Sequence, residues 1–325
     1  MSQPEGALTE LARLLASGAV TTPPGRWAFR LDTSEWTLVH DDGATALLPG
    51  RAPGTGGALI TDGDTLHRMV HGELDAMTAS ALGLLGFDGP DRESIPVVTL
   101  LMQVHNARHL APPFVDHVLG RLLAQGRVPD REGNPVPTGG WCLPADVCLG
   151  LYRLVREGGL GRTLEVGLGF GASALAICQA HADAGHGNHV AVDPWQQGEL
   201  FGGAGVHHLR EAGLERFFEL RHAPDHVALP GLVNEGNRFD LVLIDGLHML
   251  DYALLDILYA DLLLPVGGLL VLDDISLPAV ADALGYTLAN RAYCEERRFG
   301  ARAAVLKKLR EDDRAAHDVT FHVRW

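Results

Sequence analysis

The sequence predicts an α/β protein with two parts: a mostly parallel sheet with a terminal antiparallel strand, and a small α+β domain that precedes it. Two patterns support this prediction. From residue 162 onward, short apolar runs alternate with stretches of helical periodicity, which is typical of parallel strands joined by right-handed crossovers. Before residue 96, alternating apolar and polar runs flank a DDG turn and indicate a small antiparallel sheet. A length of 325 residues is also long for a single domain.

The composition indicates a soluble protein with an acidic surface. The chain has 26 basic and 41 acidic residues and a formal net charge of −15, which argues against nucleic acid or an anionic membrane as the main partner. We identify no signal peptide at the start, and the longest uncharged apolar run, 262–272, is too short to cross a bilayer. The four cysteines form no CxxC pair, so we expect free thiols and a cytoplasmic location.

The first 96 residues are predicted to form the auxiliary domain. A helix is expected over 5–18, followed by strands around Trp27 and Trp36. Two further helices are expected from about residue 65 to 70 and from about 76 to 85. Their predicted N-terminal caps are Thr61 or Asp62 for the first helix and Asp75 for the second.

The segment from about Trp27 to Asp91 resembles the sterol-carrier-protein-2-like fold. The resemblance depends on the strand residues around Trp27 and Trp36, on ITDGDTLHRMVHGELDAMTA at 60–79, and on the glycine spacing that follows it. It implies an auxiliary domain able to carry an apolar ligand. A role in packing or oligomerisation alone stays open, because no residue here requires a lipid on chemical grounds.

Residues 97–136 are predicted to be a helical linker or lid, broken at Pro112 and Pro113 and ending in a loop rich in proline and glycine. The main domain is then expected over 137–325, and its last two strands over 303–309 and 318–325.

The main domain is organised around TLEVGLGFGASALAI at 163–177. A strand ends at Val166, and three glycines at alternate positions precede a helix. Glycine is needed where the backbone turns sharply or a ligand lies against bare peptide. At the end of the next strand, Asp193 has a carboxylate that can accept the hydroxyls of a ribose. The spacing GxGxG differs from the dinucleotide pattern GxGxxG, although an NAD-type domain remains an alternative.

Residues 140–325 resemble the class I methyltransferases, a Rossmann-like family that binds S-adenosylmethionine. The matching features are the sequence from Glu165 to Gly171, the acid Asp193, and His222–Ala223 at the end of the third strand, where that family frames the adenine. The resemblance implies a set of cofactor-binding residues. These are Glu165, Gly167, Gly169, Gly171, Ser173, Asp193, His222, Ala223 and Asp245.

Three aspartates, Asp245, Asp273 and Asp274, follow apolar strands of the same sheet. The carboxyl ends of parallel strands meet at one edge, and hard carboxylate oxygens suit Mg²⁺ or another divalent cation. His248, three residues after Asp245, is a candidate base because its ordinary pKa lies near neutrality. Strand-end surface acids, helix caps and a solvated histidine are the alternatives.

The pattern IDGLH, then PVGG, then LDD over 244–274 resembles the metal-dependent O-methyltransferases of natural-product sugars, of the macrocin and mycinamicin type. That resemblance implies Mg²⁺ on the three aspartates, His248 as the base, and methyl transfer to a hydroxyl of a small natural product. The alternatives are a catechol-type O-methyltransferase that acts on an aromatic diol, and a non-catalytic carrier of apolar ligands. The auxiliary domain also makes a homo-oligomer an expectation.

Overall fold

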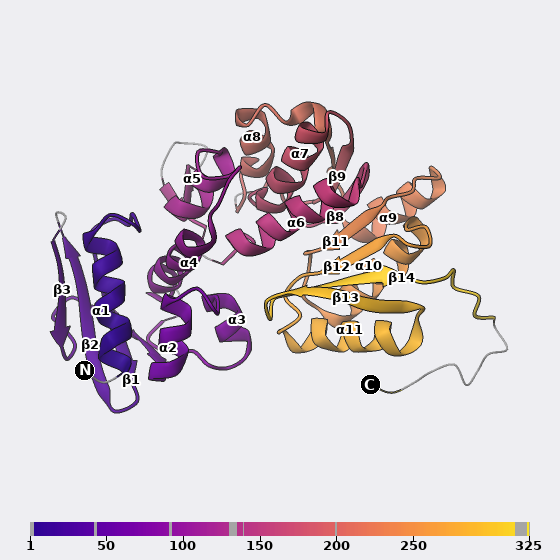
Figure 1. Cartoon of the computed structure of the whole chain (residues 1–325). Helices are drawn as coiled ribbons and strands as arrows, with labels where there is room; N and C mark the ends of the chain where they lie inside the picture. The colour runs from indigo at the N-terminus through magenta and orange to yellow at the C-terminus, as the bar shows by residue number, and fades with distance from the viewer. Residues whose placement is uncertain are drawn as a thin grey trace. The chain divides into compact units, whose positions relative to one another are not determined.

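The computed structural model describes residues 3–41, 44–90, 93–129, 135–138, 140–198, 200–315 and 324. The chain divides into two compact units, Met1–Asp146 and Val147–Trp325 (Figure 1). Because the division falls after Asp146, the helices expected to form a linker lie within the first unit. None of the described helices is long and apolar enough to span a bilayer.

The first unit is built on a five-stranded sheet of order β3-β2-β1-β4-β5, in which only the β1–β4 pair is parallel. Its helix α1 packs beside these strands (Figure 1). A short pair, β6 and β7, lies outside this sheet. The elements are α1 (Gln3–Ala16), β1 (Gly25–Leu31), β2 (Ser34–Asp41), β3 (Ala44–Pro49), β4 (Ala58–Thr61), α2 (Gly63–Val70), α3 (Ala76–Ala81), β5 (Gly86–Asp88), α4 (Ile95–His109), α5 (Val118–Gln125), β6 (Arg127–Pro129) and β7 (Pro135–Pro137).

Two of the predicted helix caps are confirmed. Oδ1 of Asp62 accepts a hydrogen bond from the backbone N–H of Thr65 at 2.7 Å, and Oδ1 of Asp75 accepts from Thr78 at 2.9 Å. These bonds satisfy amide groups that a helix start leaves without partners. The helix after Asp75 ends at Ala81 and is shorter than expected.

The second unit contains a seven-stranded sheet of order β10-β9-β8-β11-β12-β14-β13. Its first five strands run parallel and β14 is antiparallel to β12, so the predicted α/β class with a terminal antiparallel strand is confirmed. The elements are α6 (Ala145–Gly158), which begins just before the division between the units, β8 (Arg162–Val166), α7 (Ala172–Ala184), β9 (Asn188–Val192), α8 (Ala204–Glu211), the 3₁₀ turn Glu215–Phe217, β10 (Phe218–Arg221), α9 (Asp225–Asn234), β11 (Leu241–Ile244), α10 (Leu250–Leu263), β12 (Leu269–Leu272), α11 (Pro278–Asn290), β13 (Tyr293–Phe299) and β14 (Ala303–Lys308).

The terminal hairpin differs from its prediction. The strand expected at 303–309 is present as β14, and its hairpin partner is β13. The partner that the sequence suggested, 318–325, lies outside the described residues apart from Arg324. β13 was not predicted from the sequence because it is an edge strand whose central residues are charged and exposed. Its sequence therefore lacks the run of apolar residues that indicates a buried strand.

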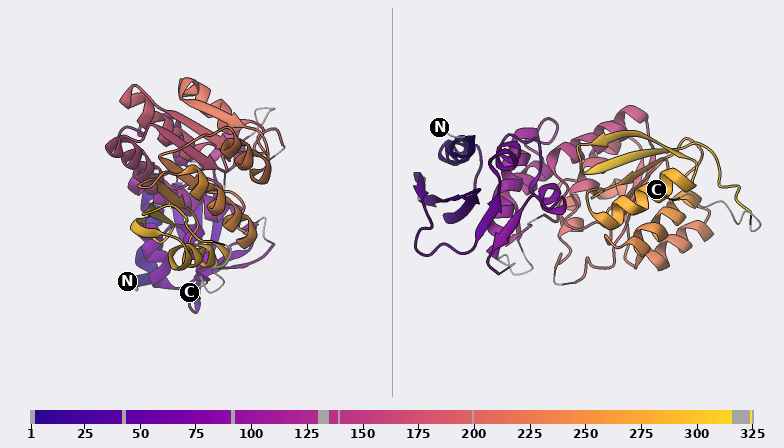
Figure 2. Two further views of the ribbon diagram at one scale, coloured as in Figure 1. Left: turned by 90° about the vertical axis from the view of Figure 1, so that its right-hand side faces the viewer. Right: turned by 90° about the horizontal axis from the view of Figure 1, so that it is seen from below.

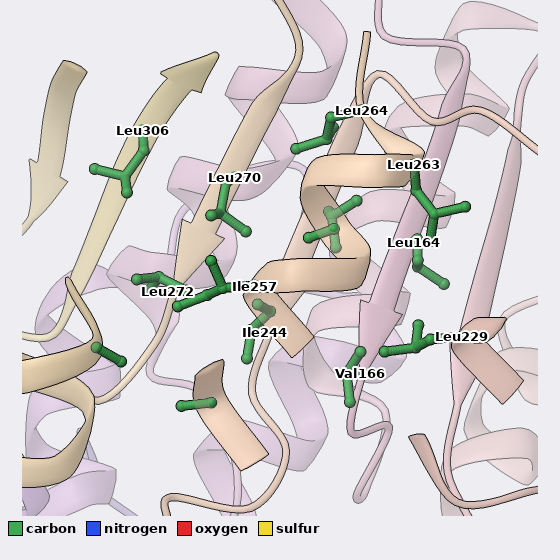
Figure 3. Close-up of a cluster of buried hydrophobic side chains, with 14 of the residues drawn as sticks. Leu164, Val166, Leu229, Ile244, Ile257, Leu263, Leu264, Leu270, Leu272 and Leu306 are labelled. Carbon is green, nitrogen blue, oxygen red and sulfur yellow. The ribbon is translucent and has the colours of Figure 1, made fainter. Parts of the chain in front are cut away.

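Alternate residues of the central strands point to opposite faces of the sheet. Leu164, Val166 and Ile244 point into an apolar core that Leu229 of α9 and Ile257 of α10 complete (Figure 3). α11 closes the same core, and two further views of these helices and strands are given in Figure 2. The intervening residues Thr163 and Glu165 point the other way and bond to polar side chains of α7.

The four cysteines are all free, as predicted. Three of them are buried, and Cys294 is half-buried.

Candidate active site

The glycine loop after β8 needs its glycines for two separate reasons. Gly167, Gly169 and Gly171 have φ angles of 93°, 51° and 84°, in the left-handed region that side chains rarely adopt. A Cβ on Gly167 would also lie 2.1 Å from the carbonyl oxygen of Asp245, in the loop after β11. The two loops therefore approach each other more closely than any residue other than glycine at position 167 would allow.

Asp193 holds this loop in place. Its Oδ2 accepts hydrogen bonds from the backbone N–H groups of Leu168 and Gly169, each at 3.0 Å, and its Oδ1 accepts from Trp195 at 2.6 Å. The side chain is buried. These oxygens bond to the loop amides in the structure, and the predicted contact of Asp193 with a ribose stays a prediction.

Gln196 completes the support of the loop, and the sequence analysis did not identify it. Its Nε2 donates to the carbonyl oxygen of Gly169 at 2.7 Å and to Oδ2 of Asp193 at 3.1 Å. A polar residue that comes three positions after the strand-end acid and lies fully buried is unusual. Burial is the missing signal, because the sequence alone does not reveal it.

Glu165 and Ser173, both expected to bind the cofactor, are buried away from solvent. Oγ of Ser173 donates to Oε2 of Glu165 at 2.6 Å, and Oε1 of Glu165 lies 3.3 Å from Nε2 of His189. Thr163 then connects His189 to His181 through contacts of 2.9 and 3.0 Å. These side chains brace the start of α7 from beneath the loop, and the cofactor contact expected of Glu165 and Ser173 stays a prediction.

His222 and Ala223 follow β10, at the same edge of the sheet as Asp193. The backbone N–H of Asp193 donates to the carbonyl oxygen of Arg221 at 3.2 Å, which places the end of β10 beside the acid. His222 is exposed and Ala223 is half-buried. Both residues are thus accessible next to the glycine loop, where the sequence expected the adenine.

Asp245, His248 and Asp274 form an acid–histidine cluster beyond β11 and β12. Nε2 of His248 lies 3.1 Å from Oδ2 of Asp274 and 3.7 Å from Oδ1 of Asp245. One candidate ligand atom from each residue lies within 4.8 Å of the others. Asp274 has a φ angle of 52°, which is unusual for a residue other than glycine and indicates local strain at this point.

Asp273 is not part of this cluster. The structure buries its carboxylate completely and pairs it with Arg302, whose Nη2 and Nε lie 2.9 and 3.1 Å from Oδ2. The expected metal ligand set of Asp245, Asp273 and Asp274 is therefore corrected: the carboxylate of Asp273 is taken up by the buried pair with Arg302, whereas Asp274 lies with Asp245 and His248. Arg302, just before β14, is a second functional residue that sequence reasoning missed.

The charges of the cluster shift the pKa values of its members. Contacts with Asp245 and Asp274 raise the pKa of His248 to about 10. Burial raises the pKa of Asp245, against the opposing effect of His248. Burial also acts to raise the pKa of Asp274, but His248 and Arg302 together bring it below its usual value. Without a bound ion, the cluster thus consists of a protonated His248 between the carboxylates of Asp245 and Asp274.

The charge balance fits a divalent cation. When ionised, Asp245, Asp273 and Asp274 carry three negative charges, and Arg302 opposes them permanently at 2.9 Å from Asp273 and 3.3 Å from Asp274. With a neutral His248 the group carries two excess negative charges, which a divalent ion would neutralise. Asp245 and Asp274 supply the carboxylate oxygens that such an ion prefers.

A comparison with known protein families finds a match that covers this region. A family model described as a methyltransferase domain matches residues 164–275, a segment that contains the glycine loop, Asp193 and the acid–histidine cluster. No curated protein sequence matches the chain.

Solved structures resemble part of the chain. A putative O-methyltransferase from Klebsiella pneumoniae is 18% identical with a TM-score of 0.47 and covers 62% of this chain and 92% of its own. The O-methyltransferase TomG from Streptomyces achromogenes, described as involved in tomaymycin synthesis and in complex with SAM, is 18% identical with a TM-score of 0.44 and covers 52% of this chain and 82% of its own. An O-methyltransferase from Bacillus cereus in complex with SAH is 15% identical with a TM-score of 0.44, covering 52% and 84%.

Proposed function

We propose that the second unit transfers the methyl group of S-adenosylmethionine to a hydroxyl oxygen of a small molecule. One observation carries the proposal: the glycine loop and the loop that bears Asp245 meet at backbone level, where a Cβ on Gly167 would lie 2.1 Å from the carbonyl oxygen of Asp245. A donor on the first loop therefore lies beside the acid–histidine cluster. The methyltransferase-domain match over 164–275 supports the same conclusion.

The donor lies against the glycine loop in this proposal. Bare peptide at Gly167 and Gly169 allows close approach, and Asp193 fixes the loop through its two bonds to backbone amides. His222 and Ala223 flank the adenine. A preformed loop lowers the entropy cost of orienting the methyl group toward the acceptor.

The acid–histidine cluster prepares the acceptor. Asp245 and Asp274 would hold Mg²⁺ or another divalent cation. When bound, such an ion lowers the pKa of a coordinated hydroxyl. With that cation held by Asp245 and Asp274, His248 would no longer serve as their counter-ion, and its Nε2 would take the hydroxyl proton. The acceptor oxygen then attacks the methyl carbon, the carbon–sulfur bond breaks, and the sulfonium becomes a neutral thioether.

The acceptor in this proposal is a sugar hydroxyl of a natural product, as in antibiotic biosynthesis. The support is the pattern IDGLH and LDD, which contains Asp245, His248 and Asp274. These three residues follow β11 and β12 and lie together in the structure. The auxiliary first unit has no assigned step, and its resemblance to a sterol-carrier fold stays a prediction.

Binding and turnover can be tested separately. Calorimetric titration with S-adenosylmethionine should give one site per chain, and release of S-adenosylhomocysteine should require both a hydroxylated acceptor and Mg²⁺ or Mn²⁺. A panel of glycosylated macrolides and catechols distinguishes the acceptor classes. Turnover of catechols alone would replace the sugar acceptor by an aromatic diol. Absence of donor binding would reject the proposal as a whole.

A further inference from the structure

A second cluster of possible metal ligands lies in the first unit, away from the residues assigned above. His105 and His109 are one turn apart on α4, and their ring centroids are 4.5 Å apart. Nε2 of His105 lies 3.0 Å from Oδ1 of Asp146. One candidate ligand atom from each of the three residues lies within 4.8 Å of the others.

The hydrogen bonds of the two rings favour metal ligation. Nε2 of His109 lies 2.7 Å from the carbonyl oxygen of Gly72. Because a carbonyl only accepts, that nitrogen carries the hydrogen and Nδ1 keeps a free lone pair in the neutral ring. A histidine held in this way by a backbone carbonyl matches the support that metal-ligating histidines generally have.

His105 has an unsatisfied ring nitrogen. The residue is 3% exposed, and among the described residues its Nδ1 has no hydrogen-bond partner. If Nε2–H donates to Asp146, a bare Nδ1 is buried without a donor, and the opposite tautomer buries an unpaired N–H. A cation held between Nε2 of His105 and Oδ1 of Asp146 would take the place of their hydrogen bond, and the ring hydrogen would then lie on Nδ1.

The scaffold of the cluster is fixed. Oδ1 of Asn106 accepts from the backbone N–H of Ala145 at 3.0 Å, and Nδ2 of Asn106 donates to the carbonyl oxygen of Leu123 at 3.2 Å. The residue before Asp146 is therefore anchored to α4. Arg108, the cation nearest in sequence, bonds to Glu10 at 2.7 Å.

We propose that His105, His109 and Asp146 bind a divalent transition-metal ion of the zinc class. Two imidazoles at positions i and i+4 of a helix, with one carboxylate from another element, form a common zinc ligand set. Imidazole nitrogens favour Zn²⁺ over Mg²⁺, so this site differs in preference from the carboxylate pair of the second unit. Three protein ligands leave one position for water, and the ion fastens the start of α6 to α4.

The first unit also provides a matched control. His67 of α2 and His71, the residue that directly follows this helix, have the same spacing, with ring centroids 4.0 Å apart. Nδ1 of His71, however, bonds to the carbonyl oxygen of His67 at 2.8 Å, and these residues form no metal-ligand group with a described acid. Spacing alone therefore does not make a site on α2.

Equilibrium dialysis of the full chain against Zn²⁺ tests the proposal. Every protein in this test also carries Asp245→Asn and Asp274→Asn, so that the carboxylate pair of the second unit cannot bind the ion. We expect one Zn²⁺ per chain, an affinity at least about tenfold lower after His109→Ala or Asp146→Asn, and no displacement by excess Mg²⁺. The double variant His67→Ala/His71→Ala should bind Zn²⁺ unchanged.

Circular dichroism checks that each variant folds. A His105→Ala variant can fail to fold because His105 is buried, and His109→Ala, at a half-buried position, then decides the result. Zinc binding that is unaltered in both His109→Ala and Asp146→Asn, or equally lowered in the control, would overturn the site. Donor binding by the second unit should be unaffected by His109→Ala, so failure of this site and failure of the proposed methyl transfer are distinguishable.

Discussion

Nη2 of Arg302 lies 2.9 Å from Oδ2 of Asp273, and the guanidinium contacts this fully buried carboxylate through two nitrogens. Replacing Arg302 by Met leaves a buried charge without its partner. We expect a loss of about 3–5 kcal/mol in the free energy of unfolding, measured by urea denaturation. The control Arg298→Met removes an exposed pair with Glu295 and should cost less than about 1 kcal/mol. Equal losses in the two variants would contradict the buried pair.

The acid–histidine cluster should determine turnover and not donor binding. Asp245→Asn, Asp274→Asn and His248→Ala are each expected to lower kcat by at least about a hundredfold, because the acceptor hydroxyl loses its base or the ligands of the cation. Without an added divalent cation, calorimetry should show donor affinity within about threefold of the parent. Asp282→Asn, on the exposed side of α11, serves as the control. Full activity in the His248 variant would remove the proposed base.

Asp193 should determine donor affinity through the loop that it supports. In Asp193→Asn, one carboxylate oxygen becomes an NH₂ group that cannot accept, so either the bonds from Leu168 and Gly169 or the bond from Trp195 are lost. Losing a hydrogen bond to a charged group costs about 1.5–3 kcal/mol, so we expect donor binding to weaken about 10- to 100-fold. Calorimetric titration with S-adenosylmethionine measures this, and an unchanged Kd would show that the loop holds without Asp193.

Gly167→Ala and Gly185→Ala separate backbone strain from close approach. Both positions have positive φ, at 93° and 76°, but a Cβ at Gly185 would meet nothing within 4 Å. We expect Gly185→Ala to cost about 1–2 kcal/mol and to keep donor affinity. Gly167→Ala adds a clash with the carbonyl oxygen of Asp245 and should abolish donor binding. Thermal denaturation and calorimetry check both outcomes, and similar behaviour of the two variants would disprove the close approach.

Asp256 of α10 should make stability depend on pH. Burial, assisted by the charge of Asp225, raises its pKa from 3.8 to about 8. Between these values the unfolded chain is ionised at this position and the folded chain is protonated, so the stability it contributes at low pH is lost as pH rises. Asp256→Asn removes this loss and should be more stable than the parent by an amount that grows from pH 5 to pH 8. Urea denaturation at both values tests this, and a pH-independent difference would contradict the raised pKa.

Much of the fold could be predicted from the sequence because its signals are local. The alternation of apolar runs, the caps Asp62 and Asp75, and the glycines that φ requires are each encoded within a few residues. β13 was missed because an edge strand with exposed charges has no such local signal.

The candidate site was less predictable because its chemistry depends on contacts between distant residues. Asp273 and Arg302 are 29 positions apart and meet only because β14 pairs with β12. The sequence likewise placed an acid at Asp193 without showing that its oxygens face the loop amides. The roles of Asp245, His248 and Asp274 as ligands and base stay predictions that the variants above test.

The backbone approach of Gly167 to Asp245 also has a thermodynamic consequence. If the donor binds the glycine loop and a cation binds Asp245 and Asp274, this contact couples the two binding events. Occupancy of one loop then changes the affinity of the other by the same factor in both directions, as reciprocity of binding free energies requires. The total binding free energy of donor and cation would not depend on the order in which they bind, and each would raise the affinity of the other.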